Sequence, residues 1–163
     1  MNAFEFHTHI YQFNRMRTLG LLDQIEQMPD PQAVLAWRPG VGRAHIGWHL
    51  MHIGITEELF ATERLAKKES VFADLLPRFR YGSIPDDDVP TPQAIRHVLE
   101  ESRKHLLETL AELDEDQLDD IPPYWKERGL PLRTVLHLIA WHEPHHQGQA
   151  HAKFNLYKAA HSA

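Results

Sequence analysis

The sequence predicts an all-α protein, a four-helix bundle in which one long loop joins the second and third long helices. Four segments repeat apolar residues at steps of three and four, which is the spacing of an amphipathic helix. No segment shows the alternation of apolar and polar residues that is typical of a strand, and proline and glycine concentrate between the four segments. With 163 residues, no internal repeat and no low-complexity tract, the chain is expected to form one domain over residues 1–163.

The composition narrows the range of partners and chemistries. The formal net charge is −6, and no basic cluster is present, which argues against nucleic acid as a partner. There is no cysteine, so disulfides, thiolate metal sites and a cysteine nucleophile are excluded, and a reducing cytoplasm is the expected location. The first residues do not resemble a signal peptide, and no apolar run approaches the roughly 20 residues of a membrane span, so no membrane association is expected.

The first long helix is predicted over residues 4–28 and should end there because Pro29 and Pro31 follow. Its apolar stripe is expected to face the core and consists of Phe6, Ile10, Phe13, Met16, Leu19 and Leu22. Near its beginning, His7 and His9 are expected to be solvated or incidental. The segment 29–42, rich in proline and glycine, should be irregular, with Trp37 at the edge of the core.

The second long helix is predicted over residues 43–67. It contains three histidines, His45, His49 and His52, whose 0, 4, 7 spacing places them on one face. A short helix over residues 70–76 and an irregular loop should complete the connection, residues 68–90.

The third and fourth long helices have clear sequence signals. Thr91 is a hydroxyl N-cap followed by proline at the first helical position, and this helix should continue to residue 113. The last helix should begin near residue 130 and end near residue 159. Pro144 lies inside it and removes the amide that the Ala140 carbonyl needs, so a local kink is expected.

The histidines of the last helix predict a metal site. His142 and His146 are four residues apart, so both imidazoles can reach one ion from the same helix face. One more ligand from the second helix would make a three-histidine site that leaves a coordination position open, as catalytic sites do. Spacing gives His52 only a small lead over His49 as the third ligand. An all-nitrogen donor set suits zinc, nickel, iron or copper.

Two motifs resemble signatures of the DinB-like (YfiT-like) superfamily. Residues 48–57, WHLMHIGITE, resemble its H-(L/I)-x-x-x-E motif, and residues 142–149, HEPHHQGQ, resemble its H-x-x-H-H-x-G-Q motif. Tyr11, Asn14 and Arg15 of the first helix and the Thr91-Pro92 helix start also fit, so the likeness covers nearly the whole chain. There are two departures: Pro144 is unusual inside the second motif, and Gln147 stands where the family often has arginine.

The resemblance implies a four-helix bundle, often a homodimer, with a divalent metal held by three histidines. Matched position by position, the ligands are His52, His142 and His146, and the metal is expected to be zinc or nickel, with iron as a further option. The implied activity is thiol S-transfer with a low-molecular-weight thiol, or a related metal-dependent hydrolysis of a small-molecule substrate. Glu57 and His145 are then candidates for contacts with the ligands or for proton transfer. The alternative is a non-catalytic, stress-associated interaction protein that binds metal in the same fold.

Overall fold

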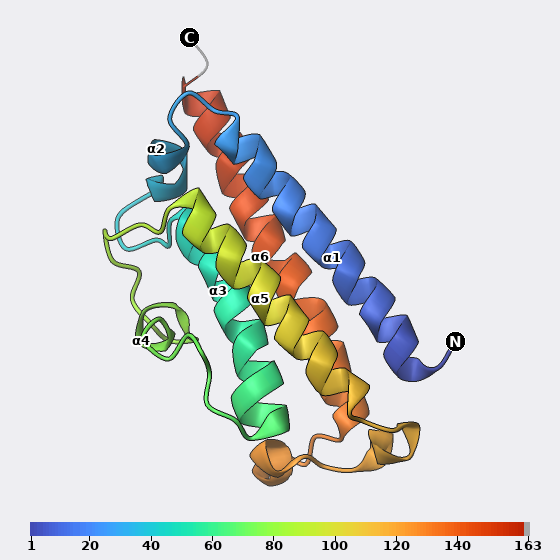
Figure 1. Cartoon of the computed structure of the whole chain (residues 1–163). Coiled ribbons are helices and arrows are strands. Elements are labelled where there is room, and N and C mark those ends of the chain that lie inside the picture. The colour runs from blue at the N-terminus through green and yellow to red at the C-terminus, as the bar shows by residue number, and fades with distance from the viewer. Residues whose placement is uncertain (162–163) are drawn as a thin grey trace.

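A computed structural model of the chain describes residues 1–161, and within this range the structure contains helices and no strand. Four long helices lie side by side: α1 (Ala3–Glu26), α3 (Ile46–Leu59), α5 (Pro92–Ala111) and α6 (Leu132–His161) (Figure 1). Shorter elements connect them: α2 (Pro31–Ala36), the π-helix η1 (Phe60–Ala66), α4 (Leu76–Phe79), and the 3₁₀ helices η2 (Glu115–Asp119) and η3 (Pro123–Arg128). The predicted all-α fold class is therefore confirmed.

Helix α3 is the central element. All 14 of its residues are buried, and it packs against both α5 and α6, while α1 covers the other side of the same two helices. Gly54 allows the close approach of α5, because a Cβ atom at this position would lie 2.8 Å from Cγ1 of Val98. His52, the expected ligand on α3, is thus placed deep inside the molecule.

Helix boundaries agree with the sequence signals to within a few residues if the π-helix η1 is counted as the continuation of α3, and local capping explains the helix starts. Asn2 caps α1 in a capping box with Glu5, and Thr91 caps α5 by accepting a hydrogen bond from the amide of Ala94, as predicted. The second long helix begins at Ile46 rather than residue 43, because His45 is its N-cap: the His45 Nδ1 accepts from the amide of Trp48 at 2.9 Å.

The predicted core-facing stripe of α1 is only half right, because Ile10, Leu19 and Leu22 face the core and its other three members do not. Phe6, Phe13 and Met16 are 53%, 59% and 58% exposed. The buried face is partly polar and consists of Phe4, His7, Tyr11, Arg15, Thr18, Leu21, Leu22 and Ile25. Polar residues can occupy it because they find partners there: the Nδ1 of His7 bonds to the Ala3 carbonyl, and Arg15 bonds to two buried carboxylates. His7, expected to be solvated, is instead buried and stacks on His137.

The connections also differ from the prediction. Residues 71–75 form turns rather than a helix, and the short helix α4 begins only at Leu76. The irregular segment after α1 contains the helix α2, which has Asp30 as its N-cap and Pro31 at its first position. In the loop that follows α4, three aspartates form ion pairs with Arg78 and Arg38, at distances of 2.9 Å (Asp86), 3.0 Å (Asp88) and 2.6 Å (Asp87).

Among residues 1–161, none of the helices combines the length with the apolar character that a membrane span requires.

Candidate metal centre

Three histidine side chains converge between α3 and α6. His52 comes from α3, and His142 and His146 come from successive turns of α6; one ring nitrogen of each lies within 4.8 Å of the others. The Nε2 atoms of His52 and His142 are 3.2 Å apart. The ring centroid of His146 lies 4.5 Å from that of His52 and 4.6 Å from that of His142. The structure therefore brings together the three residues that the sequence motifs single out.

Two of these imidazoles are oriented by bonds from their other nitrogen. The His52 Nδ1 lies 2.6 Å from the Phe79 carbonyl oxygen, and the His146 Nδ1 lies 3.1 Å from Oε1 of Gln149. Both partners are acceptors, so each Nδ1 carries the proton and each Nε2 keeps a free lone pair. The indole of Trp48 also stacks on the His52 ring, with centroids 4.6 Å apart and planes at 10°. These contacts fix the orientation of the His52 and His146 rings.

The protonation states also suit a metal. Burial is the main cause that lowers the pKa of His52, His142 and His146 below the ordinary histidine value. Burial, with a smaller effect from repulsion by neighbouring imidazoles, holds the pKa of His142 well below its usual range and lowers that of His146 to about 4. Three neutral imidazoles are therefore present at pH 7, as metal ligation requires.

The spacing of the nitrogens fits a transition metal. Two nitrogens bound to zinc at about 2.0–2.1 Å and separated by a tetrahedral angle are about 3.3 Å apart. The observed 3.2 Å between the Nε2 atoms of His52 and His142 matches this separation. The donor set and its geometry therefore fit a divalent ion such as zinc.

The other histidines of the second cluster do not join the centre. His45 is used as the cap of α3. His49 is buried one turn before His52, and its Nε2 accepts a hydrogen bond at 2.6 Å from Nζ of Lys153. Burial and the positive charge of Lys153 lower the pKa of His49 to about 3. The choice between His49 and His52, which spacing alone left open, falls to His52 in the structure.

Glu57 and His145 differ in exposure: Glu57 is buried and His145 lies at the surface. The Glu57 carboxylate is buried and bonds to Arg15, Ser102 and Arg103. Between Glu57 and His142 lies a cavity of about 10 Å³, of the order of one water molecule, which Glu143 also lines. His145 is exposed, stacks on Trp141 with ring centroids 4.5 Å apart, and lies against His146 with centroids 4.9 Å apart.

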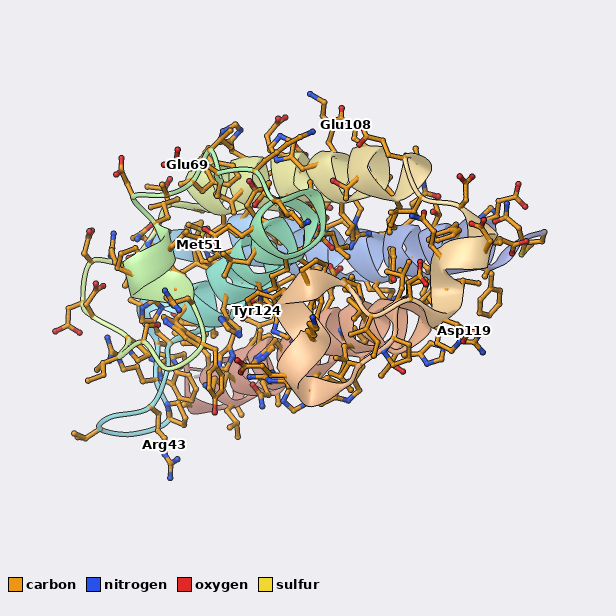
Figure 2. All side chains as sticks on the ribbon, turned by 90° about the horizontal axis from the view of Figure 1, so that it is seen from below. Arg43, Met51, Glu69, Glu108, Asp119 and Tyr124 are labelled. Carbon is orange, nitrogen blue, oxygen red and sulfur yellow. The ribbon has the colours of Figure 1, made fainter. Side chains whose placement is uncertain are left out.

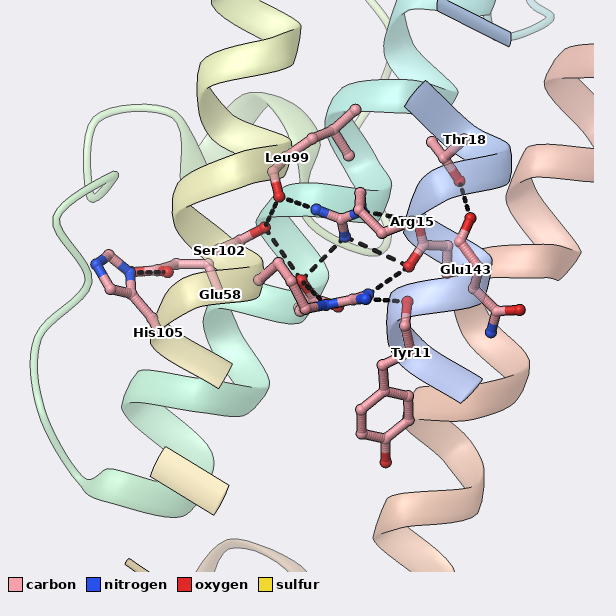
Figure 3. A network of polar contacts seen from close by, with 11 residues as sticks. Tyr11, Arg15, Thr18, Glu58, Leu99, Ser102, His105 and Glu143 are labelled. Atoms are coloured by element: carbon pink, nitrogen blue, oxygen red, sulfur yellow. Dashed lines mark hydrogen bonds and ion pairs between the residues drawn. The ribbon is translucent and has the colours of Figure 1, made fainter. Parts of the chain in front are cut away.

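A buried network of four charges lies beside the centre, and no pattern in the sequence predicted it. Each long helix contributes one residue, namely Arg15, Glu57, Arg103 and Glu143. Figure 3 shows Arg15 and Glu143 joined within this network. Arg15 lies 2.9 Å from Glu57 and 2.8 Å from Glu143, and Arg103 lies 2.6 Å from each carboxylate.

Each charge of this network is compensated. Burial alone would raise the pKa of Glu57, but the two guanidinium groups hold it below its ordinary value. Arg15 also donates to the Leu99 carbonyl and Arg103 to the Tyr11 carbonyl. The sequence indicated this network only weakly. Three of its charged residues, Arg15, Glu57 and Glu143, lie within predicted helices, but their spacing does not show that they meet.

Fold and site together define a class of protein: an all-helical protein in which three histidines from two packed helices form a group able to hold a metal ion. Residues 10–150 match the family model of the DinB superfamily, and the chain belongs to this superfamily. The matched range includes His52, His142 and His146, and the resemblance drawn from the two sequence motifs is confirmed. A search of curated proteins finds no match to the chain.

Proposed function

We propose that this protein holds a divalent transition metal at His52, His142 and His146 and uses it as a thiol S-transferase or a related hydrolase. The observation that carries the proposal is the convergence of three imidazoles, two of them oriented by Phe79 and Gln149. Zinc or nickel suits the all-nitrogen donor set best, and iron is a further option. We also propose that the four long helices form the four-helix bundle expected of this superfamily.

When bound, the ion supplies a Lewis acid that lowers the pKa of a thiol or a water molecule at an open position. The contribution of the chain is to hold three lone pairs at one point and to keep their imidazoles unprotonated. His145 is exposed and adjacent to His146, which suits a group that exchanges protons with solvent. Glu57 suits a different role, because its carboxylate is fixed by two arginines and faces His142 only across the small cavity.

The first test is metal content. Protein purified without chelators should contain about one equivalent of metal by elemental analysis, or take it up on titration. His52→Ala should lose this binding, because two imidazoles on one helix hold an ion weakly. His49→Ala is the matched control: it removes a buried histidine one turn away on the same helix and should leave the stoichiometry unchanged. Metal retained in His52→Ala, or none taken up by the wild-type protein, would refute the proposed centre.

The second test is turnover. Metal-loaded protein is incubated either with small thiols and electrophiles or with hydrolysable esters and amides. Activity that is present in the wild type and absent in His52→Ala supports the proposed enzymatic function. Metal binding without any turnover across such a panel would favour the alternative, a non-catalytic metal-binding protein associated with stress.

The homodimer remains a prediction, and α1 offers a surface for it. Phe6, Phe13 and Met16 are exposed on its outer face, and a second copy could bury them. Light scattering tests this proposal, and a monomer at all micromolar concentrations would contradict it.

A further inference from the structure

A hollow of about 480 Å³ opens beside the metal centre, between the start of α3 and the second half of α6. This volume lies in the range of small-molecule sites. Its lining includes Arg43, Ala44, Trp48, His49, Gln149 and Lys153.

Three residues of the hollow also touch the metal-site histidines. Trp48 stacks on His52, Gln149 bonds to His146, and the His49 ring lies 5.7 Å from the His146 ring, centroid to centroid. A molecule bound in the hollow is therefore adjacent to the centre.

The charge of the hollow is positive. Lys153 and Arg43 line it together, with Arg43 at the exposed rim on the loop before α3 (Figure 2). The lining contains no carboxylate, and within residues 1–161 neither cation has a carboxylate at ion-pair distance. The nearby aspartates of residues 86–88 are already paired with Arg78 and Arg38.

Lys153 is fixed in place and has donor capacity left. Its Nζ donates to the Ala44 carbonyl at 2.7 Å and to Nε2 of His49 at 2.6 Å, so two of its three N–H groups are used. Burial and then repulsion from Arg43 lower the pKa of Lys153 to about 8. The ammonium group remains mainly charged at pH 7, and an anion beside it would offset both unfavourable effects.

The position of Lys153 along α6 relates it to the centre. It lies two turns beyond His146 on the same face of the helix, and its partner His49 lies one turn before His52 on α3. The ammonium group and the three imidazoles therefore follow one seam between the two helices.

We propose that Lys153, with Arg43 at the rim, binds a carboxylate of the substrate whose reacting end lies at the three-histidine centre. This subsite rests on the proposed function, and it names the substrate class: a small molecule with a carboxylate a few bonds from the reacting group. The carboxylate can belong to the thiol or to its electrophilic partner, and the two parts of the test separate these sources.

The first part uses a matched pair of thiols, 3-mercaptopropionate and 3-mercapto-1-propanol, on cobalt-loaded protein. Thiolate bound to cobalt gives a near-ultraviolet absorption band that reports occupancy directly. The acid should bind about tenfold more tightly than the alcohol, as a charge-assisted hydrogen bond predicts. Lys153→Met should abolish the preference, Lys153→Arg should keep most of it, and Lys126→Met, a change of an exposed lysine on η3, should leave it intact.

The second part needs no metal and no thiol. The thioethers 3-(methylthio)propionate and 3-(methylthio)propanol are titrated into metal-free protein, and the indole N–H signal of Trp48 is followed by NMR. The acid should shift this signal to saturation in wild-type protein but not in Lys153→Met, and the alcohol should not shift it. If the thioether acid shifts the Trp48 signal but the thiol acid binds no more tightly than the thiol alcohol, the carboxylate belongs to the electrophilic partner.

The two parts keep the proposals distinct. If the protein takes up no cobalt, the metal function fails while the Trp48 titration still decides the subsite. If the protein takes up cobalt, the two thiols bind to it with equal affinity and the Trp48 signal does not move, then the carboxylate subsite is refuted and the metal function stands.

Discussion

At the scale of single residues, Gln149 sets the orientation of His146. Its Oε1 accepts the Nδ1 proton at 3.1 Å, which leaves Nε2 for the metal. We predict that Gln149→Leu lowers metal affinity about tenfold. This is the lower end of the range for loss of a side chain that bonds to a metal ligand, because the bond is exposed to solvent. Competition with a chromophoric chelator measures the affinity. Gln147→Leu, two residues away and without a bond to a ligand, is the control, and an equal loss in both variants would disprove the orienting role.

The sequence determined the site better on one helix than on the other. The spacing of His142 and His146 sufficed to predict that they face the same point. On α3, spacing left His49 and His52 as alternatives, because both are buried histidines on one face. What separates them is the register between α3 and α6, which places Lys153 opposite His49 and the histidine pair opposite His52. This register is a property of tertiary packing, and only the family resemblance anticipated it.

At the scale of elements, the packing of α1 against α6 compensates the proline inside α6. Pro144 provides no amide for the Ala140 carbonyl, and Nδ2 of Asn14 donates to that carbonyl instead, at 3.1 Å. We predict that Asn14→Ala lowers the free energy of unfolding by about 1 kcal/mol, the cost of an unmade, partly buried hydrogen bond. In a Pro144→Ala background the helix supplies its own amide, and the same change should cost less than half as much.

Urea unfolding of the four metal-free proteins of this cycle measures the coupling. Gln12→Ala, an exposed position on α1, serves as the reference for helix propensity. Equal costs in the two backgrounds would show that Asn14 does not replace the missing amide.

The outer and inner faces of α1 show why periodicity alone can mislead. Apolar residues recur at helical spacing on both faces, and the predicted stripe containing Phe6 and Phe13 has the cleaner repeat. The face that is buried contains His7, Arg15 and Thr18, whose burial is favourable only because each has a polar partner. His7 and Thr18 bond to carbonyls one turn earlier in α1, and Arg15 bonds to carboxylates of α3 and α6. A pattern of hydrophobicity contains no information on those partners.

At the scale of the whole molecule, the charge network joins all four long helices at one point. Two arginines and two glutamates balance, so loss of one carboxylate leaves an uncompensated positive charge in the core. We predict that Glu143→Gln lowers the free energy of unfolding by about 3–5 kcal/mol. The surface pair of Arg133 and Asp119 is the contrast, and Asp119→Asn should cost less than about 1 kcal/mol. Similar losses in the two variants would mean that the network contributes no more than a surface pair.

The buried histidines make the stability of the whole metal-free protein sensitive to mild acid. Burial, and to a smaller extent the charge of Arg38, lower the pKa of His45 to about 4. Burial is also the main cause that lowers the pKa of His49 to about 3. In the unfolded chain both groups titrate near 6.5. Between pH 6.5 and 4 the unfolded state therefore binds more protons than the native state, so the free energy of unfolding falls as the pH falls. The carboxylate Glu57, whose pKa is lowered, adds to this loss only at more acidic pH.

A single substitution isolates the contribution of His45. Asparagine is a good N-cap and does not titrate, so His45→Asn should keep the start of α3 while removing one of the protons taken up on unfolding. Its free energy of unfolding, measured with urea at pH 6.5, 5.5 and 4.5 in the presence of a chelator, should depend less on pH than that of the wild type. The difference in slope should approach about 1.4 kcal/mol per pH unit, the value for one proton. The control is His9→Asn, which removes an exposed histidine and should leave the slope unchanged. An unaltered slope in His45→Asn would mean that His45 is protonated in the native state as readily as in the unfolded chain.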